Sequence, residues 1–114
     1  MNASRYHRCI EECQACATAC EACASGCLSE EDAGQFAGCI RLDLDCAAVC
    51  RLAATLMGRE SALAEEICTL CAGVCAACAA ECDSHDAAHC RRCAEACRRC
   101  AQACREMATG PAAG

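Results

Sequence analysis

Nineteen of the 114 residues are cysteine, and most of them recur at a fixed spacing. A unit of 15 residues, in which successive cysteines are alternately three and four positions apart, occurs three times, over 13–27, 68–82 and 90–104. Alanines recur at matching places in the three copies. Thiols are ligands for soft metal ions and the reactants of disulfide chemistry, so this pattern points to metal binding or to redox chemistry.

A fourth copy of the unit, with fewer cysteines, lies between the first and the second. Its five slots hold Asp43, Cys46, Cys50, Ala53 and Met57, so two of the five keep cysteine. One step upstream, Cys9 and Cys39 occupy equivalent positions before the first and fourth copies. Four related segments therefore cover most of the chain, and together they include every cysteine.

Steps that alternate between three and four residues place every slot on one face of an α-helix. Their mean of about 3.5 residues is the repeat of helices that pack side by side at a shallow angle. We therefore predict an all-α fold, an antiparallel up-down-up-down four-helix bundle with a cysteine-lined core, as a single domain over residues 1–114. Helices are expected near 4–28, 34–57, 61–83 and 86–108, followed by a frayed tail at 109–114.

Residues that favour turns and helix ends separate the four segments. Ser29 and Asp32 resemble a capping box in the first connection, and Gly58 is a candidate for the left-handed residue after the second helix. In the third connection the candidate caps of the last helix are Asp83, Ser84 and Asp86. Because the connections are short, consecutive helices should be antiparallel. One end of the core should then hold Cys27, Cys39, Cys82, Cys90 and His85, and the other Tyr6, Cys9, Met57, Cys104 and Met107.

The composition leaves little material for an ordinary hydrophobic core. Alanine contributes 28 residues, whereas Leu, Ile, Val, Met, Phe and Tyr together contribute 17 and Trp is absent. Burial of small side chains stabilises a small domain only weakly, so disulfides, oligomerisation or bound metal must contribute. The net charge of −6 argues against a nucleic-acid partner. The sequence has no signal-peptide core and no apolar run of about 20 residues, so we expect a cytoplasmic protein with no membrane partner.

Three interpretations of the cysteines compete. Cysteine can replace small hydrophobic residues in a core, but 19 reactive thiols on matched faces are a poor choice for packing alone. Disulfides suit pairs along one helix poorly, are rare in the cytosol and would leave one cysteine of an odd number unpaired. Metal binding accounts for both the number and the arrangement of the thiols, and metal–thiolate bonds would supply the missing stability.

Soft thiolates favour Cu(I), Zn(II) or iron–sulfur clusters. Iron–sulfur clusters use cysteine-rich loops, and structural Zn(II) sites combine two pairs of ligands around one ion. A continuous row of sulfurs inside a bundle suits Cu(I), which tolerates thiolates that bridge neighbouring ions. The residues thus favour a store of many Cu(I) ions, which is not an enzyme. The alternatives are a Zn(II) or general thiol–metal buffer and a thiol–disulfide redox protein; the second is disfavoured because no strand precedes a Cys-x-x-Cys motif.

With these motifs, the sequence resembles the cytosolic branch of the bacterial copper storage proteins over residues 5–108. The resemblance implies a homotetramer of four-helix bundles, each filled with Cu(I) bound mainly by core cysteines, and a copper chaperone is a candidate partner. Carried over slot by slot, it nominates Cys9, Cys13, Cys16, Cys20, Cys23, Cys27, Cys39, Cys46, Cys50, Cys68, Cys71, Cys75, Cys78, Cys82, Cys90, Cys93, Cys97, Cys100 and Cys104.

The resemblance also implies a few ligands other than cysteine near the bundle ends. The residues in slots of the repeat that could take this role are Asp43, His85, Met57 and Met107. A buried Asp43 should either bind metal or pair with a histidine or an arginine, because an unpaired buried carboxylate is costly. His89 lies one residue off the cysteine row and is expected behind the ligands.

Overall fold

The computed structural model describes residues 2–109, and the side chains of residues 5–108. Four α-helices make up most of this part of the chain: α1 Asn2–Leu28, α2 Ala37–Gly58, α3 Ala64–Asp83 and α4 Ala88–Thr109. A 3-10 helix, η1 Ala33–Phe36, leads into α2. No strand occurs between residues 2 and 109, so the predicted all-α fold is confirmed. Of the predicted frayed tail, Thr109 belongs to α4 and the rest lies outside the described residues.

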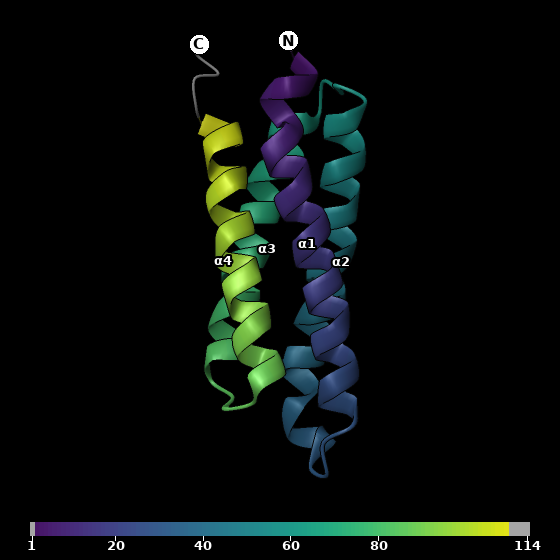
Figure 1. The fold of residues 1–114 in the computed structure, drawn as a ribbon, viewed down its shortest axis with the longest axis vertical. Helices are drawn as coiled ribbons and strands as arrows, with labels where there is room; N and C mark the ends of the chain where they lie inside the picture. The colour runs from purple at the N-terminus through teal and green to yellow at the C-terminus, as the bar shows by residue number, and fades with distance from the viewer. Residues whose placement is uncertain (1, 110–114) are drawn as a thin grey trace.

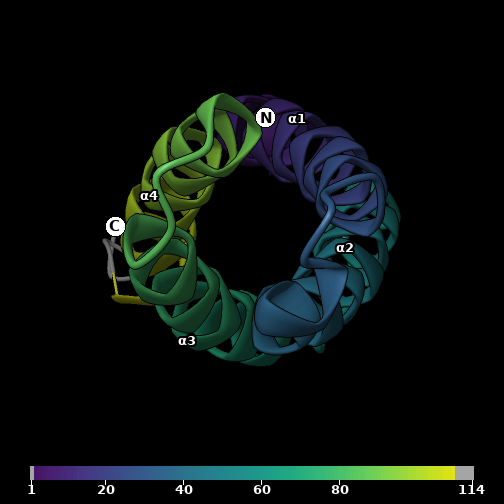
Figure 2. The ribbon, with the colours of Figure 1, turned by 90° about the horizontal axis from the view of Figure 1, so that it is seen from below.

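The helices form an antiparallel bundle around one central axis (Figure 1, Figure 2). Each helix packs against two neighbours: α1 and α3 both contact α2 and α4. The molecule measures 49 × 19 × 17 Å along its principal axes, and the predicted up-down-up-down bundle is confirmed. We call the end with the α1–α2 and α3–α4 connections the loop end, and the end with residues 2 and 109 the terminal end. None of the helices in residues 2–109 is long and apolar enough to cross a membrane.

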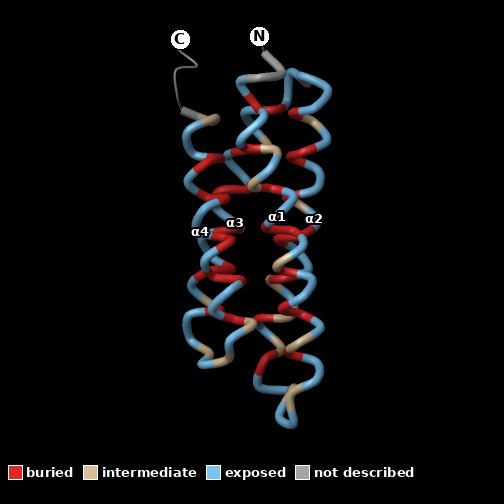
Figure 3. Tube along the Cα trace, viewed as in Figure 1, coloured by how far each residue is buried: buried red, intermediate tan, exposed pale blue. Residues whose placement is uncertain are grey.

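The core consists of thiols with few large side chains. All 19 cysteines are buried, with at most 2% of any one exposed, because the alternating spacing turns each row toward the axis (Figure 3). The three slots of the fourth copy that lack cysteine, Asp43, Ala53 and Met57, are fully buried as well. Tyr6 is buried near the terminal end and Phe36 near the loop end. The predicted cysteine-lined core is therefore confirmed.

The side-chain caps predicted in two connections are not formed among these residues. The Ser29 hydroxyl donates back to the Ser25 carbonyl at 3.3 Å, and Asp32 precedes η1 without a side-chain capping bond. In the third connection, Asp83 accepts from Arg98, Ser84 donates to the Glu81 carbonyl and Asp86 accepts from Arg91. Short polar side chains at helix ends can hydrogen-bond to several nearby groups. Here they bond to arginines or to carbonyls of the preceding turn, so they do not cap a helix.

The prediction that Gly58 would be the left-handed residue after the second helix is wrong. Helix α2 continues through Gly58, and Glu60 adopts the positive φ of 55°. The backbone N–H of Glu60 donates to the Met57 carbonyl at 3.0 Å, and that of Ser61 donates to the Leu56 carbonyl at 2.9 Å. These two hydrogen bonds form a Schellman motif, which ends a helix at a left-handed residue. The left-handed residue is therefore Glu60, two residues after the glycine.

Candidate metal-binding core

Contacts among the thiols, joined at one level by the Asp43 carboxylate, run through the bundle from one end to the other. At the terminal end the Cys9 and Cys104 Sγ atoms are 3.6 Å apart, and at the loop end Cys39 and Cys82 are 3.5 Å apart. Near the middle, Cys16 on α1 lies 3.8 Å from Cys46 on α2. The four rows therefore merge into one network, and the predicted assignment of cysteines to the two ends is confirmed.

All 19 cysteines are free thiols, and most of them form overlapping groups of four. Within each group the sulfur atoms all lie within 4.8 Å of one another. Five of the groups are Cys13, Cys71, Cys100 and Cys104; Cys16, Cys46, Cys50 and Cys75; Cys16, Cys20, Cys46 and Cys97; Cys20, Cys78, Cys93 and Cys97; and Cys23, Cys27, Cys39 and Cys90. Because several cysteines belong to two groups, thiolates in this core are placed to bridge neighbouring metal ions.

Asp43 is the one charged side chain that is fully buried among the described residues. Its carboxylate accepts hydrogen bonds from Cys78 at 3.2 Å and from Cys93 at 3.3 Å, with Cys39 and Cys82 at 3.8 and 3.9 Å. Burial raises the pKa of Asp43, and the thiol donors partly oppose that rise. Of the two alternatives expected for Asp43, pairing with a histidine or an arginine is not formed among the described residues, because thiols surround the carboxylate. A carboxylate among thiols is also placed to bind metal beside them.

The two methionines differ in how deeply they enter the core. Met57 is fully buried, and its Sδ atom accepts a hydrogen bond from the Cys68 thiol at 3.6 Å. Met107 is partly buried and packs against the edge of the core. Met57 therefore adds a thioether sulfur to the thiol network, whereas Met107 lies beside it.

The two histidines at the loop end do not lie as the repeat predicts, which was His85 beside the thiols and His89 behind them. The His85 imidazole hydrogen-bonds to Glu81 at 3.1 Å and stacks on Phe36, with 4.5 Å between the ring centroids. The His89 Nδ1 atom instead lies 3.5–3.9 Å from the sulfurs of Cys90, Cys23 and Cys27. The imidazole that reaches the thiols is thus that of His89, which sequence reasoning placed behind the ligands.

Two residues on the far side of His89 hold its ring in this position. Its Nε2 atom lies 2.8 Å from the Glu30 carboxylate, which turns Nδ1 toward the thiols in the way that second partners orient metal-binding histidines. The hydrogen bond with Cys23 raises the pKa of His89, and Glu30 raises it further. Gly26 lies against the ring: a Cβ atom there would be 2.8 Å from its Cγ and Cδ2 atoms. In the sequence, the sign of this close contact was Gly26, a glycine within a predicted helix.

Replacement of Gly26 with alanine is therefore expected to displace His89 rather than stabilise α1. Glycine to alanine within a helix ordinarily adds about 1 kcal/mol to the free energy of unfolding. Gly73 in α3 is the matched control, because a Cβ there would meet nothing within 4 Å. In urea unfolding of the reduced protein, Gly73→Ala should gain about 1 kcal/mol and Gly26→Ala should gain nothing or lose stability. Equal gains at both positions would contradict the close contact with His89.

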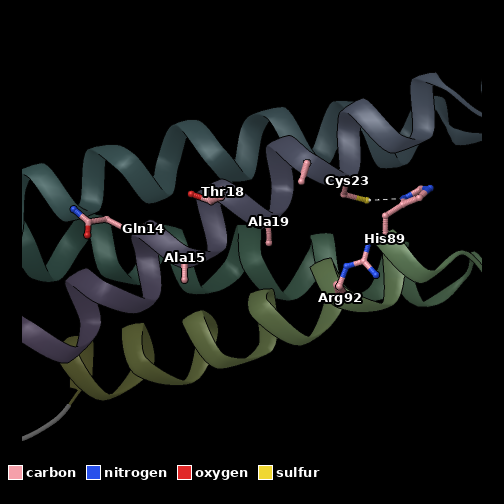
Figure 4. A pocket seen from close by; sticks show the side chains of 8 residues that line it. Gln14, Ala15, Thr18, Ala19, Cys23, His89 and Arg92 are labelled. Carbon is pink, nitrogen blue, oxygen red and sulfur yellow. Dashed lines mark hydrogen bonds between the residues drawn. The ribbon is translucent and has the colours of Figure 1, made fainter.

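A groove of about 570 Å³ lies between α1 and α4 and reaches the same residues (Figure 4). Alanines and Thr18 of α1 form much of its wall, and Arg92 of α4 flanks it. At one end of the groove are Cys23 and His89, joined by the contact drawn in Figure 4. The groove therefore leads to the place where the imidazole meets the thiols.

A four-helix bundle whose interior is a network of free thiols, with a histidine at one end, defines a protein that holds many soft metal ions. The chain belongs to the copper storage protein family, whose model matches residues 2–109.

Solved structures of two related proteins match closely. A Cu(I)-bound copper storage protein of Bacillus subtilis is 47% identical, with a TM-score of 0.89 over 92% of this chain and 99% of that one. A cytosolic copper storage protein of Streptomyces lividans is 46% identical, with a TM-score of 0.91 over 96% of each chain. An uncharacterized cysteine-rich protein of Bacillus subtilis is 49% identical over 64 residues, which span 56% of this chain and 59% of the relative.

Proposed function

We propose that this protein is a cytosolic store that sequesters many Cu(I) ions through its core thiolates. The observation that carries the proposal is a core of 19 buried free thiols, most of which fall into overlapping groups of four. Two relatives with nearly half of their residues identical are copper storage proteins, one of them described as cytosolic and the other solved with Cu(I) bound. Storage by sequestration serves copper homeostasis, and it calls for ligands rather than for a catalytic group.

Charge favours a monovalent ion over a divalent one when most of the core is filled. Each Cu(I) ion neutralises one thiolate, so a ratio near one ion per cysteine leaves the interior close to neutral. An isolated buried charge is very costly, and four thiolates around a divalent ion retain two negative charges. Soft sulfur ligands also prefer Cu(I) among the common metal ions of that charge.

The proposed ligands are the 19 cysteines, with Asp43 and Met57 within the core. Both of these residues already touch thiols that would be ligands. We add His89 at the loop end, because its Nδ1 atom lies against three cysteine sulfurs. His85 and Met107 remain predictions from the repeat; His85 would have to leave Glu81 and Phe36 in order to bind metal.

We also propose that the bundles assemble into a homotetramer. Leucines that are about half exposed lie on the outer faces of α2 and α3: Leu44, Leu52 and Leu70, with Leu63 just before α3. Large apolar side chains that are exposed together often mark contacts between subunits. Sedimentation of the reduced protein measures the mass of the assembly. A copper chaperone is the proposed partner for delivery.

A titration of the reduced protein with Cu(I) against a competing chelator tests the storage function. We expect tight uptake of well over ten ions per chain, with one proton released for each thiol that binds. Saturation at one to four ions would overturn the proposal and favour a general thiol–metal buffer. A redox role is disfavoured because every cysteine is buried, and disulfide exchange needs an accessible thiolate.

A further inference from the structure

Four sulfur atoms near the middle of the bundle form a tetrahedral group with five short edges. They belong to Cys16 on α1, Cys46 and Cys50 on α2, and Cys75 on α3, which we call the tetrahedral cage. Cys46 is 3.8, 3.9 and 3.6 Å from Cys16, Cys50 and Cys75. Cys75 is 3.9 Å from Cys16 and 3.7 Å from Cys50. The sixth pair, Cys16 and Cys50, lies within 4.8 Å.

These separations match the size of one particular kind of metal site. Zn(II) binds four thiolates at about 2.3 Å in a tetrahedron, and a tetrahedron of that radius has edges of about 3.8 Å. Five of the six edges of the cage are sulfur–sulfur contacts of 3.6–3.9 Å. The group of Cys16, Cys20, Cys46 and Cys97 makes four such contacts, at 3.6–3.9 Å. The group of Cys23, Cys27, Cys39 and Cys90 also makes four, at 3.8–4.0 Å. The cage can therefore accept a divalent ion with little movement of its helices.

We propose that the tetrahedral cage binds one divalent d10 cation, Zn(II) or Cd(II), when Cu(I) is scarce. The four thiols release four protons as the ion enters, and the product is a tetrathiolate centre with two negative charges. Neither oxidation nor reduction is involved. The site does not depend on copper storage, although it uses four of the same thiols, and Cu(I) in excess would displace the divalent ion.

Thiols around the cage can stabilise its two negative charges. Cys71 lies 3.6 Å from Cys50 and 3.8 Å from Cys75, and either sulfur of each pair can donate. Cys20 lies 3.9 Å from Cys16, and Cys100 lies 3.9 Å from Cys50. While these outer cysteines stay protonated, their S–H groups point hydrogen bonds at the thiolates of the cage. Hydrogen bonds to ionised groups are the stronger kind, so a divalent centre is better supported here than in an apolar core.

The cage joins three of the four helices, so an ion bound there would hold the copper-free bundle together. Cys46 and Cys50 are one turn apart on α2, and Cys16 and Cys75 come from the two helices that flank α2. A ligand that binds only the folded chain raises its stability by an amount that grows with the logarithm of the free ligand concentration relative to Kd. A single divalent ion per chain would thus stabilise a protein whose aliphatic core is small, without filling the store.

Spectroscopy of the reduced full-length protein with Co(II), followed by Zn(II), tests the proposal. We expect the intense visible bands of tetrahedral Co(II), saturation at one ion per chain, and release of the ion when Cu(I) is added. Cys46→Ser should lower Co(II) affinity by roughly a hundredfold or more. Ala53→Ser, at a fully buried slot of α2 that is not a proposed ligand, is the matched control and should leave affinity unchanged; Cys75→Ser provides a second cage variant if Cys46→Ser loses its helical circular dichroism.

Several results would contradict the proposal that the cage binds a divalent ion. One is an absence of tetrahedral bands in the folded wild-type protein. Another is survival of the bands in both Cys46→Ser and Cys75→Ser. A third is an equal loss of affinity in Ala53→Ser. X-ray absorption of the Zn(II)-loaded wild-type protein is independent of any variant: four sulfur neighbours support the cage, and a shell that includes oxygen or nitrogen contradicts it. Divalent binding without displacement by Cu(I) would instead count against copper storage alone.

Discussion

The reduced, copper-free protein is expected to unfold as the pH rises from 9 to 11, whereas the Cu(I)-loaded protein stays folded. Burial raises the pKa of Cys27 and Cys39 well above the ordinary value of 9.0, and that of Cys90 to about 11. In the unfolded chain these thiols ionise near pH 9, while in the bundle they keep their protons. Their contribution to stability is complete below pH 9 and is lost as the pH rises toward 11.

The size of this effect is comparable with the stability of a whole domain. Each such thiol costs about 1.4 kcal/mol per pH unit, so the three together cost about 4 kcal/mol per pH unit and about 8 kcal/mol by pH 11. Small domains are stable by about 5–15 kcal/mol. Bound Cu(I) replaces the protons, so the loaded protein has no such dependence.

Far-ultraviolet circular dichroism under anaerobic, reducing conditions measures the transition. The matched variant replaces Cys27, Cys39 and Cys90 with serine, which removes these three titrations and should weaken the pH dependence by about 4 kcal/mol per pH unit. A copper-free protein that remains helical at pH 11, or a loaded protein that unfolds in parallel with it, would refute the expectation. The comparison needs no knowledge of the number of ions bound.

Substitution of Asp43 by asparagine is expected to stabilise the copper-free protein at neutral pH. Burial raises the pKa of Asp43, so its contribution is favourable below the ordinary value of 3.8 and is lost as the pH rises above it. An amide of the same shape keeps an oxygen acceptor for Cys78 and Cys93 and carries no charge. We expect a gain of about 1–3 kcal/mol at pH 7, together with weaker or slower copper binding nearby.

Urea unfolding at pH 4 and pH 7 distinguishes this explanation from a general effect of the substitution. The difference between wild type and Asp43→Asn should grow from the lower pH to the higher one, because only the carboxylate ionises. Asp45→Asn is the control: Asp45 is exposed and lies two residues away on α2. A difference that does not change with pH, or one shared by both variants, would show that the charge of Asp43 is not the cause.

The spacing of the cysteines was enough to predict the helices and the residues that line the core. Even slots without cysteine, such as Asp43 and Met57, are fully buried where the repeat places them. Helix ends were less predictable, because turn geometry depends on backbone bonds several residues away. The left-handed position fell on Glu60 since the N–H groups of Glu60 and Ser61 reach the last carbonyls of α2.

The cysteine repeat could not predict which side chains on different helices contact one another. His89 lies off its cysteine row and still touches three thiols, because Gly26 on α1 leaves room for the ring and Glu30 turns it. His85 occupies a slot of the repeat yet stacks on Phe36. The shape of the tetrahedral cage likewise depends on the axial register of three helices. No local pattern in the sequence predicts that register.

The buried slots of the fourth copy have a consequence for how such a protein can change over generations. Asp43, Ala53 and Met57 stand where the other copies have cysteine, and the bundle still closes around all three. Capacity is therefore a graded trait: a lineage can lose or regain one thiol at a time while the fold persists. Selection can then adjust, by single substitutions, how much metal the protein stores.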